Sequence, residues 1–170
     1  MNKISKALLV VMAKEPVPGR VKTRLSPPLT PTEAAGLYSC MIEDRLTEMK
    51  TLDGIDLALA YTPEYTEKSF STVVPKNFTL FYQYGENLGD KLIHIFKDNL
   101  AKGYEAVSVI GSDIPELTSG IVETAFTSLK TNACVFGPSR DGGYYLIGLN
   151  EKSAHHLVNI LFDQVNWSTD

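Results

Sequence analysis

The sequence predicts an α/β fold in which helices pack on a mostly parallel β-sheet, and three observations lead to this prediction. Short apolar runs alternate along the chain with segments of helical periodicity, which is the pattern of a layered α/β domain. The first run, Ala7–Ala13, contains no polar residue, as is typical of a strand buried on both faces. The chain has 170 residues, of which 44% are hydrophobic, enough for one domain with a full core.

Each element in the first half of the chain has its own local signal. The motif Thr30-Pro31-Thr32-Glu33 predicts a helix start, because it combines an N-cap, a proline at the first helical position and a glutamate for a capping box. This helix is expected to end near Met49. Short or alternating apolar runs then predict, in order, a strand at Ile55–Thr62, a short helix from Pro63 to about Ser71, and a strand at Phe78–Gln83.

The second half of the chain continues the alternation. Apolar residues recur at helical spacing from Leu88 to Leu100, and Gly103 is expected to end that helix. Ser119 is a candidate N-cap for a helix that runs to Leu129. The remaining predicted elements are strands at Glu105–Gly111, Ala133–Gly137 and Tyr144–Leu149 and a last helix at Lys152–Phe162.

Composition and charge argue against several classes of protein. The formal net charge of −4 and the pI near 5.4 argue against a nucleic-acid partner, which needs a broad basic surface. No run approaches the ~20 apolar residues of a membrane helix, and Ala7–Ala13 is at the lower limit for a secretory signal. Cys40 and Cys134 lack metal-ligand spacing, and free thiols suit a reducing compartment. We therefore expect a cytoplasmic protein with neither nucleic acid nor a membrane as partner.

Four basic side chains gather in one loop after the first predicted strand, although the chain as a whole is acidic. They are Lys14, Arg20, Lys22 and Arg24. Roughly sixteen residues separate strand from helix, where about 2–6 are usual, and prolines restrict the loop. A solvated charged surface is one interpretation. Because like charges on a restricted loop repel one another unless an anion joins them, we favour a phosphate site, with Gly19 letting the backbone approach the ligand.

Aspartates follow two of the later predicted strands. Asp113 lies just beyond the fourth strand, where Ser112 leaves room for a ligand, and this placement suits a carboxylate that holds Mg²⁺ or Mn²⁺ on bound phosphates. A turn-capping aspartate is the alternative. Asp141 precedes two glycines, which is also a strong hairpin signal. It is the candidate general base if the acceptor is a hydroxyl.

Gln83, Gly85 and Gly89 follow the third predicted strand. Gln83 and the nearby backbone could contact a base or ribose, or the glycines could form only a turn. In open α/β sheets, ligands bind beyond the carboxyl ends of the strands. We therefore expect the basic loop, Asp113 and Asp141 to converge there.

Four motifs along the chain resemble one bacterial family. They are K-x-P-x-P-G-x-V-K-T-R-L at residues 14–25, G-S-D-I-P-x-L at 111–117, G-P-x-x-D-G-G-Y-Y-L-I-G-L at 137–149 and W-S-T at 167–169. The family comprises glycosyltransferase-A-like transferases of the radical-SAM/selenodomain-associated type, which are similar to phospholactate and molybdenum-cofactor guanylyltransferases. The resemblance implies a Rossmann-like, three-layer α/β/α fold of the nucleotide-diphospho-sugar transferase superfamily. Members usually continue beyond W-S-T, so we expect residues 1–170 to be a single nucleotide-binding domain that lacks a C-terminal segment.

The resemblance also implies roles for individual residues and for the whole protein. Arg20, Lys22 and Arg24 would contact nucleotide phosphates, Asp113 would bind the metal, Asp170 would be a second metal ligand, and Lys22, Arg24, Asp113 and Asp141 would act in catalysis. The implied activity is metal-dependent transfer from a nucleoside triphosphate or nucleotide-diphospho-sugar to a small-molecule acceptor. Nucleotidyl transfer to a phosphorylated acceptor is slightly preferred, because the metal aspartate is isolated and the loop is rich in cations. Glycosyl transfer and a non-catalytic nucleotide-binding module are the alternatives.

Overall fold

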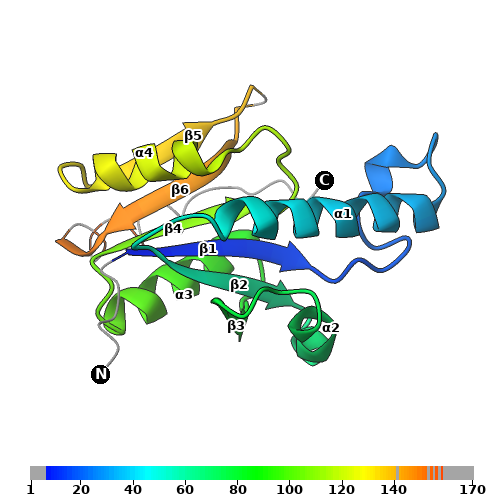
Figure 1. The fold of residues 1–170 in the computed structure, drawn as a ribbon, viewed down its shortest axis with the longest axis horizontal. Helices are drawn as coiled ribbons and strands as arrows, with labels where there is room; N and C mark the ends of the chain where they lie inside the picture. Colours follow the sequence, from blue (N-terminus) through cyan, green and yellow to red (C-terminus); the bar gives the residue numbers. More distant parts are fainter. Residues whose placement is uncertain (1–6, 141, 153, 155, 157, 159–170) are drawn as a thin grey trace.

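The computed structural model describes residues 7–140, 142–152, 154, 156 and 158 (Figure 1). Strands and helices alternate in it, as the sequence predicts. The elements are, in chain order, β1 (Ala7–Lys14), the 3₁₀ turn η1 (Thr23–Leu25), α1 (Pro31–Met49), β2 (Asp56–Thr62), the 3₁₀ turn η2 (Glu64–Thr66), α2 (Glu67–Ser71), β3 (Phe78–Tyr82), α3 (Leu88–Ala101), β4 (Ala106–Gly111), α4 (Ser119–Leu129), β5 (Cys134–Pro138) and β6 (Tyr144–Asn150).

A six-stranded sheet in the order β3-β2-β1-β4-β6-β5 forms the centre of the molecule. β1 pairs in parallel with β2 and β4, and β2 pairs in parallel with β3. β6 runs antiparallel to both β4 and β5, so β5 points the same way as β1. The carboxyl ends of β1 to β5 therefore meet at one edge of the sheet, toward which the β1 arrow points in Figure 1. We call this the carboxyl edge.

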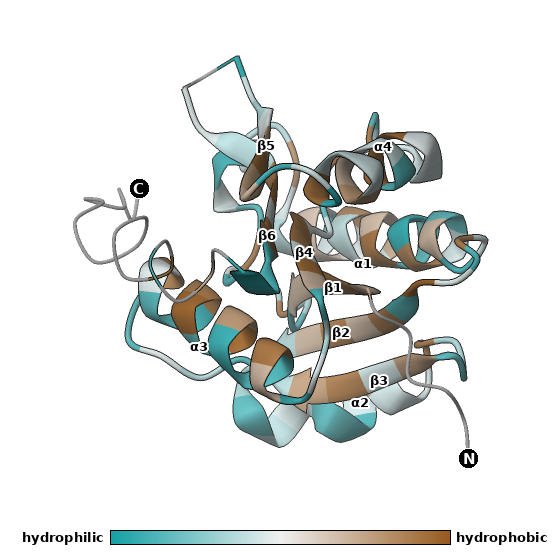
Figure 2. Ribbon diagram, turned by 90° about the vertical axis from the view of Figure 1, so that its left-hand side faces the viewer, coloured by the Kyte–Doolittle hydropathy of each residue, from teal (hydrophilic) through white to brown (hydrophobic). Residues whose placement is uncertain are grey.

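Helices cover both faces of the sheet and give three layers (Figure 2). α1, α2 and α4 pack on the face that contains Leu9 and Val11, and α3 packs on the face that contains Leu8 and Val10. Successive residues of β1 thus enter opposite halves of the core, which is why Ala7–Ala13 can be apolar without interruption. The expected three-layer α/β/α fold with a mostly parallel sheet is confirmed.

Local hydrogen bonds fix the starts of the helices that border the carboxyl edge. At the start of α1, Thr30 Oγ1 accepts from the backbone nitrogen of Glu33, and the Glu33 carboxylate accepts from the backbone nitrogen of Thr30 at 2.8 Å. The hydrogen bonds that the Glu33 carboxylate accepts from the backbone nitrogen and the hydroxyl of Thr30 lower the pKa of Glu33. At the start of α3, Asn87 Oδ1 accepts from the backbone nitrogen of Asp90 at 2.9 Å. The predicted capping box is therefore present, and α1 starts beside the basic loop.

The structure differs from the predicted elements at the start of α4, where the N-cap is Thr118 and not Ser119, and at one short helix. The predicted helix from Pro63 to Ser71 is the turn η2 followed by the short α2. The described residues of the predicted last helix, among them Lys152 and Val158, are helical, and the rest of that segment lies outside the described residues. Within the described part of the chain, no helix is long and apolar enough to span a membrane.

Candidate functional site

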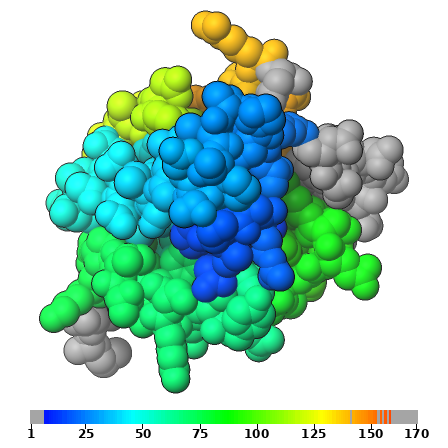
Figure 3. Space-filling view, turned by 90° about the vertical axis from the view of Figure 1, so that its right-hand side faces the viewer, coloured from blue at the N-terminus to red at the C-terminus, as the bar shows by residue number. Residues whose placement is uncertain are grey.

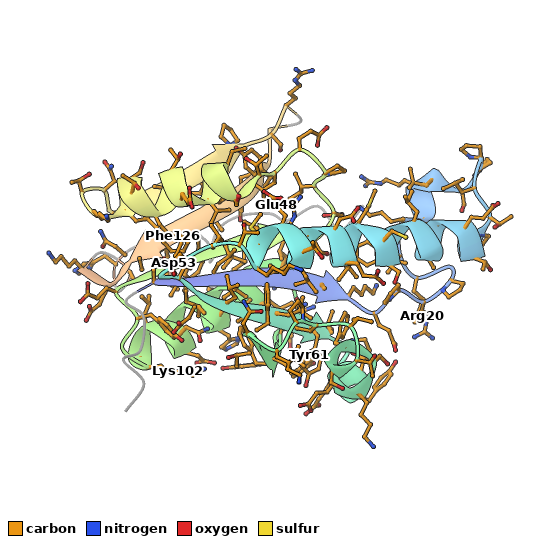
Figure 4. The ribbon with its side chains drawn as sticks, viewed as in Figure 1. Arg20, Glu48, Asp53, Tyr61, Lys102 and Phe126 are labelled. Atoms are coloured by element: carbon orange, nitrogen blue, oxygen red, sulfur yellow. The ribbon has the colours of Figure 1, made fainter. Side chains whose placement is uncertain are left out.

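The loop between β1 and α1 carries the basic cluster across the carboxyl edge, and it lies, in blue, at the centre of the face in Figure 3. Val21 is buried in the core and anchors the middle of this loop. Gly19 has a φ of +75°, a value that glycine adopts without strain. Arg20, labelled in Figure 4, and Arg24 are exposed on either side of the anchor. The loop thus presents its arginines to solvent at the edge where the strands end.

Lys22 and Asp113 meet at this edge, although 91 residues separate them in the sequence. Nζ of Lys22 forms an ion pair with Oδ2 of Asp113. The Lys22 backbone has φ 49° and ψ 36°, a left-handed conformation that is uncommon for residues other than glycine. The two side chains are 24% and 39% exposed, so a ligand in solvent can reach both. The structure therefore brings a cation of the loop and the aspartate after β4 into one site.

Tyr38 of α1 connects the two sides of the site. Its hydroxyl accepts a hydrogen bond from the backbone nitrogen of Lys14 at 3.1 Å and lies 2.9 Å from Oγ of Ser112. Nζ of Lys22 lies 5.6 Å from the centre of its ring, within range of a cation–π interaction. Burial raises the pKa of Tyr38, so the hydroxyl stays protonated. Ser112 thus turns its hydroxyl toward Tyr38, and its contribution to a ligand would come from its backbone.

Arg45, further along α1, makes polar contacts with the segment that follows β4. It is buried, at 4% exposure, and its guanidinium donates to the backbone carbonyls of Ile114 and Leu117. Helical periodicity alone places both Tyr38 and Arg45 on the core side of α1, and no motif identifies their polar contacts. The one sequence signal is an arginine on a buried helix face, where charged residues are rare unless paired.

Gln83 takes a structural position at the end of β3. It is 4% exposed, and its Nε2 donates to the carbonyl of Ala13 at 2.9 Å and to that of Ala60 at 3.0 Å. Both hydrogens of the amide nitrogen are therefore used inside the protein, where they hold the ends of β1, β2 and β3 together. The set of nucleotide-binding residues that we propose below omits Gln83 for this reason.

α3 adds a cation that no sequence motif indicates, Lys91. Gly85 has a φ of +139°, and a Cβ there would lie 2.7 Å from the backbone nitrogen of Lys91, so glycine is needed for α3 to pack this closely. Gly89 is buried in the first turn of α3.

Burial and the nearby charge of Lys14 lower the pKa of Lys91. In the described part of the chain neither lysine ammonium has an ion-pair partner, so the two together would attract an anion.

The tip of the β5–β6 hairpin projects from the same edge (Figure 1). The backbone nitrogen of Ser139 donates to the carbonyl of Gly143 at 2.9 Å, and that of Gly142 donates to the carbonyl of Ser139 at 3.2 Å. The glycines that follow Asp141 therefore do form a hairpin turn. Asp141 and Asp170 lie outside the described residues, and their expected roles as base and as metal ligand stay predictions.

The fit of a metal ion to this site depends on Asp113. No group of three or more histidine, cysteine, aspartate or glutamate side chains comes together among the described residues. Mg²⁺ commonly takes one or two protein carboxylates and completes its shell with water and phosphate oxygens. The single carboxylate beside Lys22 therefore fits a cation that arrives with phosphates, and does not by itself fit a cation held by protein ligands alone.

A cavity of about 650 Å³ lies at the opposite edge of the sheet. Two of its lining residues, Asp53 and Phe126, are labelled in Figure 4 at the end of the molecule away from Arg20. The cavity also borders Ala7 and Ala106, the first residues of β1 and β4. Because ligands of open α/β sheets bind at the carboxyl ends of the strands, and the polar cluster lies there, the carboxyl edge is the candidate functional site.

Comparison with known proteins identifies the family. A family described as "Uncharacterized protein conserved in bacteria (DUF2064)" matches residues 45–169. The chain belongs to the DUF2064 family. The matched region of this DUF2064 protein includes Asp113 and the β5–β6 hairpin. No curated protein matches the chain significantly.

Solved structures extend the similarity of this DUF2064 protein to the basic loop. A protein assigned as a nucleotide-diphospho-sugar transferase from Desulfovibrio desulfuricans G20 is 32% identical, with a TM-score of 0.89 over 98% of this chain and 71% of that chain. The 4-diphosphocytidyl-2C-methyl-D-erythritol synthase of Anaerococcus prevotii DSM 20548 is 11% identical, with a TM-score of 0.59 over 97% and 79%. CMP:2-keto-3-deoxy-manno-octonic acid synthetase in complex with CTP is 12% identical, with a TM-score of 0.55 over 97% and 80%. The last two share the fold alone, and the radical-SAM-associated type stays a prediction.

Proposed function

We propose that this DUF2064 protein is a metal-dependent transferase whose donor is a nucleoside triphosphate or a nucleotide-diphospho-sugar. The observation that carries the proposal is the meeting of Lys22 and Asp113 at the carboxyl edge of a mostly parallel sheet. A metal–polyphosphate needs such a pair, because the phosphates require positive partners and the metal requires oxygen ligands. The similarity to a protein assigned as a nucleotide-diphospho-sugar transferase supports the same conclusion.

In this proposal, different cations at the carboxyl edge bind different parts of the donor. Arg20, Lys22 and Arg24 belong to the basic loop and hold the phosphates, where they stabilise the negative charge that develops on the leaving group. Lys14 and Lys91, whose charges lie near one another, hold a further anionic group of the donor. Catalysis then consists mainly of positioning and charge stabilisation.

Asp113 is the described residue that would hold Mg²⁺ or Mn²⁺, with Asp170 proposed as a further ligand. When bound, the metal supplies Lewis-acid polarisation of the phosphoryl oxygens. Lys22 exchanges its partner as the donor binds: its ammonium turns from Asp113 to a phosphate and leaves the carboxylate free. The ring of Tyr38, 5.6 Å from Nζ of Lys22, keeps the ammonium close to the site during this exchange.

The reaction that we favour is nucleotidyl transfer to a small phosphorylated acceptor. A phosphate oxygen of the acceptor attacks the α-phosphorus of the triphosphate in line, the bond from that phosphorus to the bridging oxygen breaks, and pyrophosphate leaves with the electron pair. An ionised phosphate has no proton to lose, so this reaction needs no general base. A hydroxyl acceptor would need one, and Asp141 is the proposed base in that case.

Glycosyl transfer from a nucleotide sugar is the second candidate. It is favoured by the 32% identity to the protein assigned as a nucleotide-diphospho-sugar transferase. Here the acceptor attacks the anomeric carbon of the sugar, and the nucleoside diphosphate leaves with the electrons of the broken bond. The released product, pyrophosphate or nucleoside diphosphate, distinguishes the two reactions.

Binding can be tested before the acceptor is known. The melting temperature is measured against a panel of nucleoside triphosphates and nucleotide sugars, each with and without Mg²⁺ or Mn²⁺. A ligand at a hundred times its Kd adds about 2.7 kcal/mol to the free energy of unfolding. Lys22→Met should weaken binding about tenfold or more, as expected for loss of a charge-assisted contact, and Lys50→Met, an exposed lysine at the end of α1, is its matched control. A panel without any shift would overturn the proposal.

Turnover is then measured with the donor that binds and a set of phosphorylated acceptors. Asp113→Asn should abolish the metal-dependent release of pyrophosphate or nucleoside diphosphate. A non-catalytic nucleotide-binding module would behave differently, because nucleotide binding would survive Asp113→Asn and no acceptor would yield product.

A further inference from the structure

Three polar side chains of α1 contact the segment that follows β4, residues 112–119. They are Tyr38, Arg45 and Glu48, spaced seven and three residues apart, a spacing that places all three on one side of a helix. Tyr38 contacts Ser112 at the start of the segment. Glu48, labelled in Figure 4, contacts its far end, where Oε1 accepts from the backbone nitrogen of Ser119 at 2.8 Å. α1 thus holds both ends of the segment that carries Asp113.

Arg45 holds the middle of the same segment. Its two terminal nitrogens donate to the carbonyls of Ile114 and Leu117, an arrangement that suits the planar fork of a guanidinium and that a lysine cannot reproduce. Its Nε is buried without a hydrogen-bond partner among the described residues. Removal of the guanidinium would leave the carbonyls of Ile114 and Leu117 without this donor and would weaken the contact between α1 and the segment. The specific contribution of Arg45 therefore lies in where it fixes the segment.

The position of Asp113 depends on these backbone contacts once a donor has bound. In the described structure its carboxylate has a single ionic partner, Lys22, and the side chain is 39% exposed. Under the proposed function, Lys22 leaves Asp113 for a phosphate, so the ion pair cannot keep the carboxylate in place. The carbonyl held by Arg45 belongs to Ile114, the next residue along the chain.

We infer that Arg45 is a positioning residue, which keeps Asp113 in place for the metal–donor complex by holding the backbone of Ile114 and Leu117. The inference rests on the proposed function, because it assigns Asp113 to the metal. Glu48 assists at the far end, where it accepts from the first residue of α4, a helix whose N-cap residue makes no side-chain cap bond. Preorganisation of this kind raises affinity because less freedom is lost on binding.

A double-mutant cycle tests the inference. The variants are Arg45→Met, Arg45→Lys and Asp113→Asn, and each Arg45 variant combined with Asp113→Asn. The probe is the Mg²⁺ complex of the common nucleoside triphosphate that raises the wild-type melting temperature most. We expect Arg45→Met to weaken the Kd about tenfold when Asp113 is intact and less than about twofold in the Asp113→Asn background, since only coupled residues depart from additivity. Arg45→Lys should recover less than half of the loss. Equal effects in both backgrounds, or a folded Arg45→Met with unchanged affinity, would overturn the inference.

Hydrogen exchange gives a readout that needs no ligand. In Arg45→Met, the backbone amides of Leu117 and Ser119, which donate to Ile114 and Glu48, should exchange at least about tenfold faster, while amides of β1 keep their wild-type rates, as expected of a local opening. Uniform acceleration across the chain, or unchanged rates, would contradict the inference. Absence of nucleotide binding by the wild type counts against the proposed function instead, and the exchange rates still decide whether Arg45 holds the segment.

A second variant keeps the test decisive if Arg45→Met fails to fold. Glu48→Ala leaves the buried guanidinium in place and removes the acceptor for Ser119, together with a negative charge near Arg45. It should accelerate exchange at the far end of the segment and weaken the Kd about two- to threefold, again only when Asp113 is present. Glu43→Ala is the matched control, because Glu43 is exposed on the same helix. Equal behaviour of Glu48→Ala and Glu43→Ala would overturn the inference.

Discussion

The hydroxyl of Tyr38 lies 2.9 Å from Oγ of Ser112 and accepts from the backbone nitrogen of Lys14 at 3.1 Å. One side chain of α1 thereby joins the ends of β1 and β4, which are neighbours in the sheet. Tyr38 is 6% exposed, so water cannot easily replace either contact. The geometry of the carboxyl edge therefore depends on a residue that no sequence motif contains.

Tyr38→Phe tests this dependence, because it removes the hydroxyl and keeps the ring. We expect the free energy of unfolding to fall by about 1–3 kcal/mol, the cost of leaving buried polar partners unsatisfied, and nucleotide affinity to fall with it. Urea unfolding measures the first effect and calorimetric titration the second. Tyr65→Phe, at a tyrosine that is 74% exposed, should change stability by less than about 0.5 kcal/mol. Equal effects of the two substitutions would show that the Tyr38 hydroxyl contributes nothing.

Lys91→Met should raise the melting temperature of the protein and weaken its affinity for nucleotide. Burial and the charge of Lys14 lower the pKa of Lys91, which means that folding disfavours the charged form and that protonated Lys91 opposes folding at neutral pH. We therefore expect the variant to melt at a higher temperature than the wild type at pH 7, and this gain to disappear as the pH rises above 10.5, the ordinary value for lysine. Nucleotide affinity should fall about tenfold, as for loss of a charged hydrogen bond. Lys97→Met, exposed on the same helix, should leave both quantities unchanged.

Gly85→Ala should destabilise the end of β3. The residue has a φ of +139°, and the new methyl group would lie 2.7 Å from the backbone nitrogen of Lys91, which cannot move without shifting α3. We expect a loss of about 1–3 kcal/mol in the free energy of unfolding. Gly36→Ala is the control, since Gly36 lies in α1 with open space around it. That substitution should add about 0.5–1 kcal/mol, so a loss at Gly36 or a gain at Gly85 would contradict the assigned environments.

The contact between Glu48 and Ser119 predicts a pH dependence. The hydrogen bond from the backbone nitrogen of Ser119 lowers the pKa of Glu48 below its ordinary value of 4.5. A depressed pKa stabilises the fold fully above the unfolded value, and this contribution is lost as the pH falls through the folded value. Wild type should therefore exceed Glu48→Gln in stability by about 0.5–1 kcal/mol at pH 6–8, and the difference should shrink below pH 4.5. Urea unfolding midpoints of both proteins at pH 7, 5, 4 and 3 measure this difference. The same difference at all four pH values would exclude Glu48 as the source of the pH dependence.

The convergence of Lys22 and Asp113 could be predicted because it depends only on strand direction. Each residue follows a buried strand, and parallel strands end at the same edge. The order of the strands could not be predicted in this way. The apolar pattern of Tyr144–Leu149 is the same for a parallel or an antiparallel strand, and the insertion of β6 between β4 and β5 depends on contacts across the whole sheet.

The hydrogen bonds of buried polar side chains could not be predicted from sequence periodicity either. Helical periodicity reports which side of α1 is buried, but it says nothing about the atoms that the ends of Tyr38 and Arg45 touch. Gln83 illustrates the same point: an amide after a strand is compatible with a nucleobase or with carbonyls. The neighbouring ends of β1 and β2 decide between them, and those ends are distant in the sequence.

The buried side chain of Val21 lies between Arg20 and Lys22, so both charged side chains extend from one anchored stretch of backbone. A chain of linked phosphates can contact both side chains at once, whereas a single phosphate offers fewer charged oxygens to share between them. We expect the protein to distinguish donors by the number of linked phosphates, and to discriminate strongly against monophosphates and inorganic phosphate.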